Sequence, residues 1–253
     1  MCETKIYGHR GCMGMFPENT LLGFRKAIEL GVDGLEIDVH MTKDGEIVVI
    51  HDETLDRTTD GSGFIKDLTL DEIKQFSAGV KYTHFQDYDP ANWEMERVPT
   101  LKELLELLEP YPIDLNIELK TYQFHYEGIE EKVLSIVEQY GNRRNVIYSS
   151  FHLPTLLRMK SRDKETNIAW LLDQPITHPL DYMNVFDLEA LHLSKRMTLS
   201  DPYEWKGMLD KIRVWTVNEK DELKQLLDLR VNAIITDFPE KALFYRSERL
   251  TFS

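Results

Sequence analysis

The chain has 253 residues, a formal net charge of −14 and a hydrophobic content of 42%. This length suits one large domain or two small ones, and the hydrophobic content suits an ordinary globular core. The negative charge disfavours nucleic acid and anionic membranes as main partners, because both repel an acidic surface.

The amino-terminal sequence MCETKIYGHR lacks the apolar stretch of a signal peptide, and no later apolar run approaches the length of a membrane span. The two cysteines, Cys2 and Cys12, are too few for a disulfide framework. We therefore expect a cytoplasmic protein without stable membrane association, and its oligomeric state stays open.

Short β-rich runs alternate along the chain with amphipathic helical patterns. The leucines of TLKELLELLE, for example, recur at the spacing of one helix face. Such alternation predicts parallel strands joined by crossover helices. The candidate strands are 5–9, 34–39, 46–51, 113–119, 145–150, 167–172, 189–194, 212–217 and 232–237, and the candidate helices are 20–30, 100–109, 128–140, 153–162, 220–229 and 239–249.

Two neighbouring strands are joined only by MTKDG, which is too short for a helix and has turn chemistry around Gly45. They therefore form a hairpin, and the nine candidates leave eight parallel strands. Eight strands in about 250 residues predict a single (β/α)8 TIM-barrel domain over 1–253. The hairpin extends the second strand, within an inserted segment at about 40–99. A doubly wound open sheet is the alternative, although its usual glycine-rich dinucleotide loop is missing.

Polar residues stand at the ends of several predicted strands, where a core would need apolar ones. Glu36 and Asp38 alternate with apolar neighbours, so their side chains share one face. In a barrel the carboxyl ends of the strands form the mouth, where barrel enzymes have their sites. The residues expected at this mouth are His9, Arg10, Glu36, Asp38, His51, Glu118, Lys120, Trp215 and Asn218.

These residue types fit the hydrolysis of a phosphate ester. Carboxylates placed close together repel one another unless a cation lies among them, and oxygen ligands suit Mg²⁺ or Ca²⁺. Arg10 and Lys120 could then hold an anion against that metal, and two histidines supply acid and base near neutral pH. We expect one divalent cation, and the residues do not choose between Mg²⁺ and Ca²⁺.

The motifs GHRG, FPENT, GLEIDVHMTKDGEIVVIHD, NIELK and VWTVN with IITDFP occur in this order, and the match that they make runs from roughly His9 to Pro239. Together they resemble the glycerophosphodiester phosphodiesterase family. This resemblance implies a TIM barrel that hydrolyses glycerophosphodiesters, which are deacylated phospholipids, to glycerol 3-phosphate and an alcohol such as choline or ethanolamine. The partner that it implies is a small-molecule phosphodiester substrate.

The resemblance also implies a role for each matching residue. His9 and His51 correspond to the acid/base pair, without a choice of which is the acid. Glu36, Asp38 and Glu118 correspond to the metal ligands. Arg10 and Lys120 correspond to phosphate contacts, and Trp215 to an aromatic near the substrate or, alternatively, to core packing.

Other readings remain open beside this one. A catalytically silent barrel that binds a phosphorylated metabolite would have lost a histidine or a carboxylate of the motifs. A phospholipase C or D acting on intact lipid would show an apolar or basic rim. For the reaction itself, attack by the substrate's 2-hydroxyl competes with direct attack by water.

Three further expectations concern residues beside the motifs. Asn19 is expected to cap the helix that follows it. His40 is expected to be a solvated side chain on the hairpin. The aromatic stretch 79–99 has no helical or strand periodicity, so it is either a rim element at the alcohol side or a self-packed loop.

Overall fold

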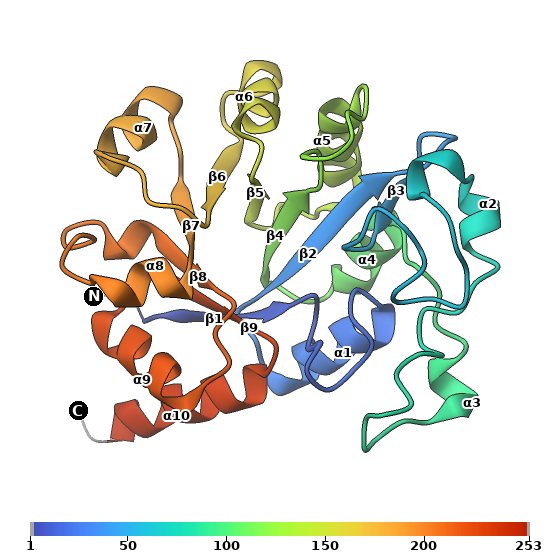
Figure 1. The fold of residues 1–253 in the computed structure, drawn as a ribbon, viewed down its shortest axis with the longest axis horizontal. Coiled ribbons are helices and arrows are strands. Elements are labelled where there is room, and N and C mark those ends of the chain that lie inside the picture. Colours follow the sequence, from blue (N-terminus) through green and yellow to red (C-terminus); the bar gives the residue numbers. More distant parts are fainter. Residues whose placement is uncertain (1–2, 252–253) are drawn as a thin grey trace.

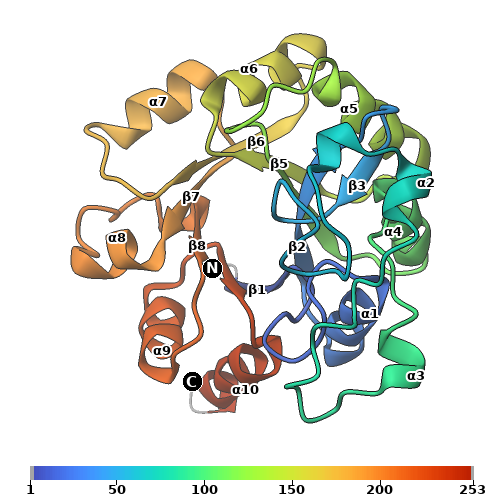
Figure 2. The same ribbon diagram turned by 45° about the vertical axis from the view of Figure 1, so that its right-hand side comes forward.

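The protein is a closed barrel of parallel strands with an outer ring of helices, seen in a computed structural model that describes residues 3–251 and the side chains of 3–249 (Figures 1 and 2). One nine-stranded sheet runs in the order β1-β9-β8-β7-β6-β5-β4-β2-β3, and pairing of β1 with β2 closes the ring. The predicted TIM barrel is therefore confirmed. Cys2 lies outside the described residues.

The strands are β1 (Lys5–His9), β2 (Gly34–Met41), β3 (Ile47–Val49), β4 (Asp114–Leu119), β5 (Val146–Ser150), β6 (Asn167–Leu172), β7 (Ala190–Ser194), β8 (Ile212–Trp215) and β9 (Ala233–Thr236). The α-helices are α1 (Leu21–Leu30), α2 (Leu70–Ile73), α3 (Pro90–Trp93), α4 (Leu101–Leu108), α5 (Ile129–Tyr140), α6 (Leu153–Arg162), α7 (Pro179–Phe186), α8 (Lys195–Ser200), α9 (Lys220–Leu229) and α10 (Pro239–Thr251). Two 3₁₀ helices are η1 (Ile65–Asp67) and η2 (Leu209–Lys211). Helices α2, α3, α7 and α8 were not expected from the sequence. None of them is longer than eight residues, and the pattern of one apolar face is weak over so few residues.

The main core lies between the strands and the ring of helices. Outward-facing strand residues such as Ile37 and Ile117 pack there against helix residues such as Leu104 and Phe24, all fully buried. Inside the barrel the apolar contacts are sparse and form two small clusters, one around Tyr7 and one around Ile147. The rest of the barrel interior carries polar side chains, so the barrel has a polar centre that is wrapped by an apolar layer.

The predicted hairpin is present. Strand β3 pairs antiparallel with β2, with Val39 opposite Val49, and the turn places Gly45 at φ 84°. Strand β3 ends at Val49, so the polypeptide returns to the mouth as an irregular segment that carries His51.

The chain between the hairpin and α4 forms a separate small core on the outside of the barrel. Its buried apolar residues are Val48, Ile50, Leu55, Ile65, Ile73, Ala78 and Val98. Figures 1 and 2 show α2 and α3 beside the barrel, next to α4 and α1 rather than over the ring of strands. This small core fixes the segment that brings His51 back to the mouth.

Candidate active site

The residues predicted from the strand ends meet at one cavity in the barrel mouth. This inner cavity has a volume of about 110 Å³, and its lining includes every predicted catalytic, metal-binding and substrate-binding residue except Asp38. Asp38 lies directly behind the lining, where its Oδ2 is 3.1 Å from Arg10 Nε and its Oδ1 is 3.7 Å from Lys120 Nζ. Strand register explains the gathering, because His9 is paired with Glu36 and Asp38 with Glu118 across neighbouring strands.

Three carboxylates are concentrated at this point. Glu36, Asp38 and Glu118 are 5%, 1% and 8% exposed, and each offers an oxygen within 4.8 Å of the others. Burial raises the pKa of Glu36 well above its ordinary value, and the charges of Asp38 and Glu118 raise it further. Burial also raises the pKa of Glu118, although Lys120 opposes the rise. The cluster is therefore electrostatically strained without further positive charge.

Asp38 responds in the opposite direction. Burial alone would raise its pKa, but the Arg10 guanidinium and the Lys120 ammonium outweigh burial and lower the pKa below its ordinary range. One oxygen of Asp38, Oδ1, is buried and has no hydrogen-bond partner among the described residues. An ionised carboxylate oxygen with no donor, beside two further carboxylates, suits a hard divalent cation that prefers oxygen ligands. The residues present thus fit the expected metal.

His9 is held by a carboxylate that was not among the site residues predicted from the sequence. Its Nδ1 lies 2.6 Å from Oδ1 of Asp237, which follows β9. Asn218 fixes this carboxylate in turn, because its Nδ2 donates to Asp237 Oδ2 at 2.6 Å and its Oδ1 accepts from the Asp237 backbone N–H at 3.0 Å. Burial would raise the pKa of Asp237, but the hydrogen bond from His9 outweighs it and the pKa is lowered. Nε2 of His9 therefore faces the cavity and lies 3.8 Å from Glu36 Oε2.

His51 is held in the same way. Its Nδ1 lies 2.7 Å from Oδ1 of the next residue, Asp52. Arg57 Nε donates to the other oxygen of Asp52 at 2.7 Å. Burial lowers the pKa of His51, with a smaller opposing effect from the charge of Asp38. Each predicted catalytic histidine thus has a carboxylate beside Nδ1, and its Nε2 is available for proton transfer.

A chain of charged groups connects this second pair to Arg10. Arg57 Nη1 donates to Glu18 Oε2 at 2.6 Å, and Glu18 Oε1 accepts from Arg10 Nη1 at 2.9 Å. Burial would raise the pKa of Glu18, but hydrogen bonds from Arg57 and the charge of Arg10 lower it. Glu18, Asp52, Arg57 and Asp237 were missed as site residues. Glu18 and Asp237 stood in the quoted motifs FPENT and IITDFP, and Asp52 directly follows His51, whereas Arg57 carried no sequence signal.

The expectation for Asn19 was wrong. The cap of α1 is Thr20, whose side chain accepts from the Gly23 N–H, and Asn19 has a left-handed backbone with φ 52°. Asparagine tolerates this conformation better than most residues. The turn points its amide at the carboxylate cluster, where Nδ2 donates to Asp38 Oδ2 at 3.0 Å.

His40 was also misjudged, since it is fully buried rather than solvated. Its Nε2 lies 3.0 Å from the backbone carbonyl of His51 and its Nδ1 lies 2.8 Å from the Tyr126 hydroxyl. A carbonyl can only accept, so Nε2 carries the proton and Nδ1 accepts from the hydroxyl. Burial lowers the pKa of His40 to about 4, which keeps this pattern near neutral pH. His40 therefore anchors the segment that carries His51.

The wall and floor of the inner cavity come from the later strands. The ring of Trp215 is half-buried, meets Phe151 edge-on at 5.5 Å, and donates from Nε1 to the His192 carbonyl at 3.0 Å. Asn116 and His192 also line the cavity. His192 Nε2 accepts from Arg213 at 3.2 Å, so its proton is on Nδ1. The Asn116 Oδ1 and the His192 Nδ1 have no hydrogen-bond partner among the described residues.

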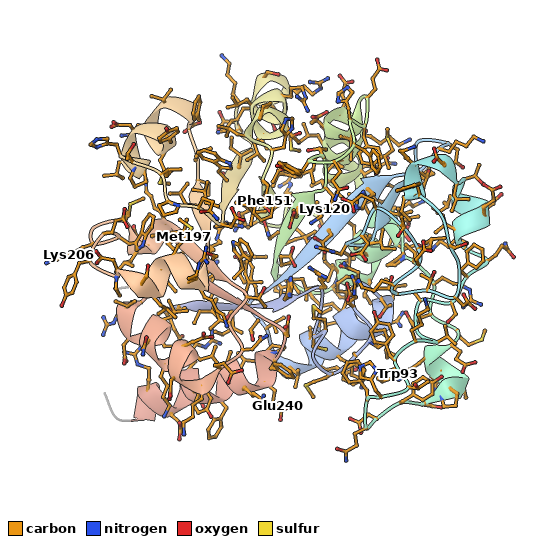
Figure 3. All side chains as sticks on the ribbon, viewed as in Figure 1. Trp93, Lys120, Phe151, Met197, Lys206 and Glu240 are labelled. Atoms are coloured by element: carbon orange, nitrogen blue, oxygen red, sulfur yellow. The ribbon has the colours of Figure 1, made fainter. Side chains whose placement is uncertain are left out.

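A second, outer cavity of about 430 Å³ adjoins the first. The two share His51, Glu118, Lys120, Phe151 and Leu171 in their linings, and the outer cavity adds Glu53, Leu119, Tyr122, Gln123, Ser150, Trp170, Leu172 and Asp173. Figure 3 shows Lys120 and Phe151 near each other over the centre of the barrel. The aromatic stretch 79–99 contributes to neither lining. Its aromatic rings contact one another; the ring centroids of Tyr82 and Phe85, for example, are 5.9 Å apart. Trp93 also contacts Phe16 outside this stretch, with ring centroids 5.4 Å apart. These contacts agree with the prediction of a self-packed loop.

Comparisons with known proteins agree with this geometry. The model of the glycerophosphoryl diester phosphodiesterase family matches residues 9–241. A glycerophosphodiester phosphodiesterase from Caldanaerobacter subterraneus subsp. tengcongensis is 38% identical over 241 residues, which cover 94% of this chain and 96% of that protein. One from Bacillus altitudinis is 35% identical, over 97% of this chain and 99% of that protein.

A solved structure points to the same family. A phosphodiesterase from Oleispira antarctica, in complex with the product sn-glycerol-3-phosphate, has a TM-score of 0.82 and 28% identity, covering 97% of each chain.

Within the described part of the chain, no helix has both the length and the apolar character that crossing a bilayer requires. The chain belongs to the glycerophosphoryl diester phosphodiesterase family and is an enzyme of the phosphodiesterase class.

Proposed function

We propose that the protein hydrolyses small glycerophosphodiesters to glycerol 3-phosphate and a free alcohol, using His9 and His51 with one divalent cation. The observation that carries this proposal is the meeting of two carboxylate-held histidines and a buried three-carboxylate cluster at one cavity of about 110 Å³. The net charge of −14 supports a small-molecule substrate over a nucleic acid or an anionic membrane surface.

Glu36, Asp38 and Glu118 would hold the cation, Mg²⁺ or Ca²⁺, which when bound supplies charge stabilisation to the phosphoryl oxygens. Arg10 and Lys120 would contact the same phosphate. Burial would lower the pKa of Lys120, but Glu118 and Asp38 outweigh it and raise the pKa, so the ammonium keeps its proton. Both cations are already oriented by carboxylates, which reduces the reorganisation needed when the phosphate binds.

The two cavities suggest how the histidines divide their work. His9 lines only the inner cavity, whereas His51 lines both. With the glycerol in the inner cavity and the leaving alcohol in the outer one, His9 Nε2 takes the proton of the glycerol 2-hydroxyl as its oxygen bonds to phosphorus. His51 donates a proton to the alcohol oxygen as its bond to phosphorus breaks, and the phosphate's negative charge favours the protonated imidazole. Water then opens the cyclic phosphate: His51 takes a proton from the water as the water oxygen bonds to phosphorus, and His9 gives its proton back to the glycerol 2-oxygen as that oxygen's bond to phosphorus breaks.

The floor of the inner cavity supports this orientation of the substrate. Asn116 Oδ1 can accept and His192 Nδ1 can donate a hydrogen bond, and both atoms are buried without a partner in the part of the chain that the structure describes. A glycerol hydroxyl can satisfy both kinds of group, because it donates one bond and accepts others. A hydrocarbon end could satisfy neither.

Hydrolysis of a glycerophosphodiester panel, followed by release of glycerol 3-phosphate, tests this function. Excess chelator should abolish turnover, and Mg²⁺ or Ca²⁺ should restore it. His9→Ala and His51→Ala should each lower kcat by about 10²–10⁴-fold, the usual loss on removing a general acid or base. Full activity in chelator after dialysis would exclude the metal. Turnover of intact phospholipid alone would favour the phospholipase reading, and binding of glycerol 3-phosphate without turnover would favour a silent barrel.

A further inference from the structure

We propose that Arg57 is a positioning residue, which fixes His51, the proposed acid, and keeps the charge of Arg10 available for the phosphate. This inference rests on the proposed function, because it assigns a further residue to the same reaction. Arg57 lines neither the inner nor the outer cavity. It therefore acts through its neighbours rather than by touching the substrate.

The guanidinium group of Arg57 makes a forked contact with each of two carboxylates. Nε donates to Asp52 Oδ2 at 2.7 Å, and Nη2 donates to Asp52 Oδ1 at 2.9 Å. On the other side, Nη1 donates to Glu18 Oε2 at 2.6 Å, and Nη2 donates to Glu18 Oε1 at 2.8 Å. Such paired donors in two directions are a property of arginine, because a lysine ammonium is a point charge without a fork.

The contact with Asp52 determines how the His51 ring is held. Asp52 Oδ1 lies 2.7 Å from His51 Nδ1, and Arg57 binds both oxygens of the same carboxylate. Burial would raise the pKa of Asp52, but the hydrogen bonds from Arg57 and His51 outweigh burial and lower the pKa to about 2. Because this carboxylate is ionised and cannot rotate freely, it accepts from Nδ1 in one geometry and keeps Nε2 directed at the cavity.

The contact with Glu18 acts on the charge of Arg10. Glu18 is 5% exposed, and its Oε1 accepts from Arg10 Nη1 at 2.9 Å. If Glu18 had no other partner, its negative charge would cancel that of Arg10 and weaken the attraction of Arg10 for a phosphate. The guanidinium of Arg57 neutralises Glu18 instead, so the positive charge of Arg10 remains available.

The chain around Arg57 is held by contacts that do not need the Arg57 side chain. Leu55 is fully buried in the small outer core, and its carbonyl accepts from Thr59 Oγ1 at 2.8 Å. The Leu55 N–H donates to the Gly63 carbonyl at 3.1 Å. The Arg57 side chain itself is 46% exposed. Its replacement therefore opens no cavity in the core, and the variants should fold.

Three variants test the inference, with glycerophosphocholine as substrate and glycerol 3-phosphate as ligand at constant Mg²⁺. Arg57→Gln should lower kcat about 10- to 100-fold, the usual loss when a partner of a site residue is removed, and weaken glycerol 3-phosphate binding about threefold to tenfold. Arg57→Lys restores the charge without the fork, so it should recover binding but not kcat. Arg246→Gln is the matched control, because Arg246 also bridges two carboxylates, Glu3 and Asp33, but beside the amino-terminal ends of β1 and β2. It should lower thermal stability and leave both other quantities unchanged.

Nitrogen NMR of the His51 ring supplies a readout that needs no turnover, and His51→Gln identifies its signals. In the wild type the neutral ring should carry its proton on Nδ1. In Arg57→Gln the proton should be shared between Nδ1 and Nε2, whereas Arg246→Gln should match the wild type.

Either a wild-type kcat or an unchanged His51 tautomer in Arg57→Gln overturns the inference, while hydrolysis by the wild type stands. Equal losses of kcat in Arg57→Gln and Arg246→Gln would show a merely structural role, and full recovery of kcat in Arg57→Lys would show that the fork is dispensable. If the wild type hydrolysed no glycerophosphodiester, the proposed function would fail, and the His51 tautomer would still report on Arg57.

Discussion

Nδ1 of His9 lies 2.6 Å from Oδ1 of Asp237, although 228 residues separate them in the chain. They meet because β1 and β9 are neighbours in the closed barrel, with Gly8 paired with Thr236 directly before the two residues. The contact fixes the tautomer and the orientation of an imidazole whose other nitrogen faces the carboxylate cluster. Barrel closure thus places an orienting carboxylate behind a catalytic candidate.

Asp237→Asn should lower kcat by about 10²–10⁴-fold while leaving the fold intact. The amide can donate to Nδ1, which would move the imidazole proton to Nε2 and remove the base from the cavity. The measurement is kcat across pH, with thermal unfolding as the check on folding. Asn218→Ala, which frees Asp237 without removing its charge, should cost less. A kcat near that of the wild type in Asp237→Asn would contradict the orienting role.

Asn19 and Thr20 allow a paired test of neighbouring residues. Asn19→Ala removes the donor to Asp38 Oδ2 and should weaken Mg²⁺ binding about 10- to 100-fold, the usual effect of losing a hydrogen bond to a metal ligand. Thr20→Ala removes the cap of α1 and should lower the free energy of unfolding by about 1 kcal/mol with little change in metal affinity.

Activity as a function of Mg²⁺ concentration and urea unfolding separate the two effects. The assignment fails if Thr20→Ala shifts the metal titration as much as Asn19→Ala does. It also fails if Asn19→Ala lowers only the free energy of unfolding.

The polar residues at the strand ends of the barrel were predictable because two features of the sequence agree. Alternation along a strand places Glu36 and Asp38 on one face, and the parallel order of strands places Glu118 at the same end. The hairpin that returns His51 was readable from a turn too short for a helix. These features depend on local sequence and on the rules of sheet topology, so the sequence alone is enough to predict them.

The partners of the site residues were less predictable because distant parts of the chain supply them. His40 looked like a solvated side chain on a hairpin, yet Tyr126, 86 residues later in the chain, packs beside it. The Tyr126 hydroxyl donates to His40 Nδ1, and His40 Nε2 donates to the His51 carbonyl. Arg57 bridges Asp52 and Glu18 from an irregular segment with no periodic pattern. Such contacts follow from how loops fold over the barrel mouth.

His192 gives a pH dependence whose sign can be worked out. Burial, followed by the charge of Arg213, lowers its pKa well below the ordinary value of 6.5. Below pH 6.5 the unfolded chain therefore binds a proton that the folded protein does not, and the stability that comes from keeping His192 neutral is lost as pH falls.

The wild type should lose up to about 1.4 kcal/mol per pH unit in this range relative to His192→Gln, which can still accept from Arg213 but does not titrate. Urea unfolding of both proteins between pH 5 and 8, at constant metal, measures the difference. Other titrating groups are common to both chains and cancel. Parallel stability curves would show that His192 is not held neutral.

The last prediction concerns the nucleophile. In the proposed reaction the glycerol 2-hydroxyl attacks phosphorus within the same molecule, and a tethered attack of this kind gains a large advantage over attack by a separate molecule. A diester of choline with 3-phospho-propane-1,3-diol lacks that hydroxyl but keeps the terminal one. It should bind with little loss and turn over at least about 10³-fold more slowly.

The matched substrate, with propane-1,2-diol in place of glycerol, keeps the 2-hydroxyl and lacks the terminal one. It should be hydrolysed through the cyclic phosphate, which phosphorus NMR can detect, with its loss appearing mainly in KM. The alternative is direct attack by water, for which the 2-hydroxyl is dispensable. Rapid hydrolysis of the first substrate, together with no cyclic intermediate from the second, would favour direct attack by water on phosphorus. His9 would then not act as the base for a glycerol hydroxyl, and the polar floor would not orient that hydroxyl for attack.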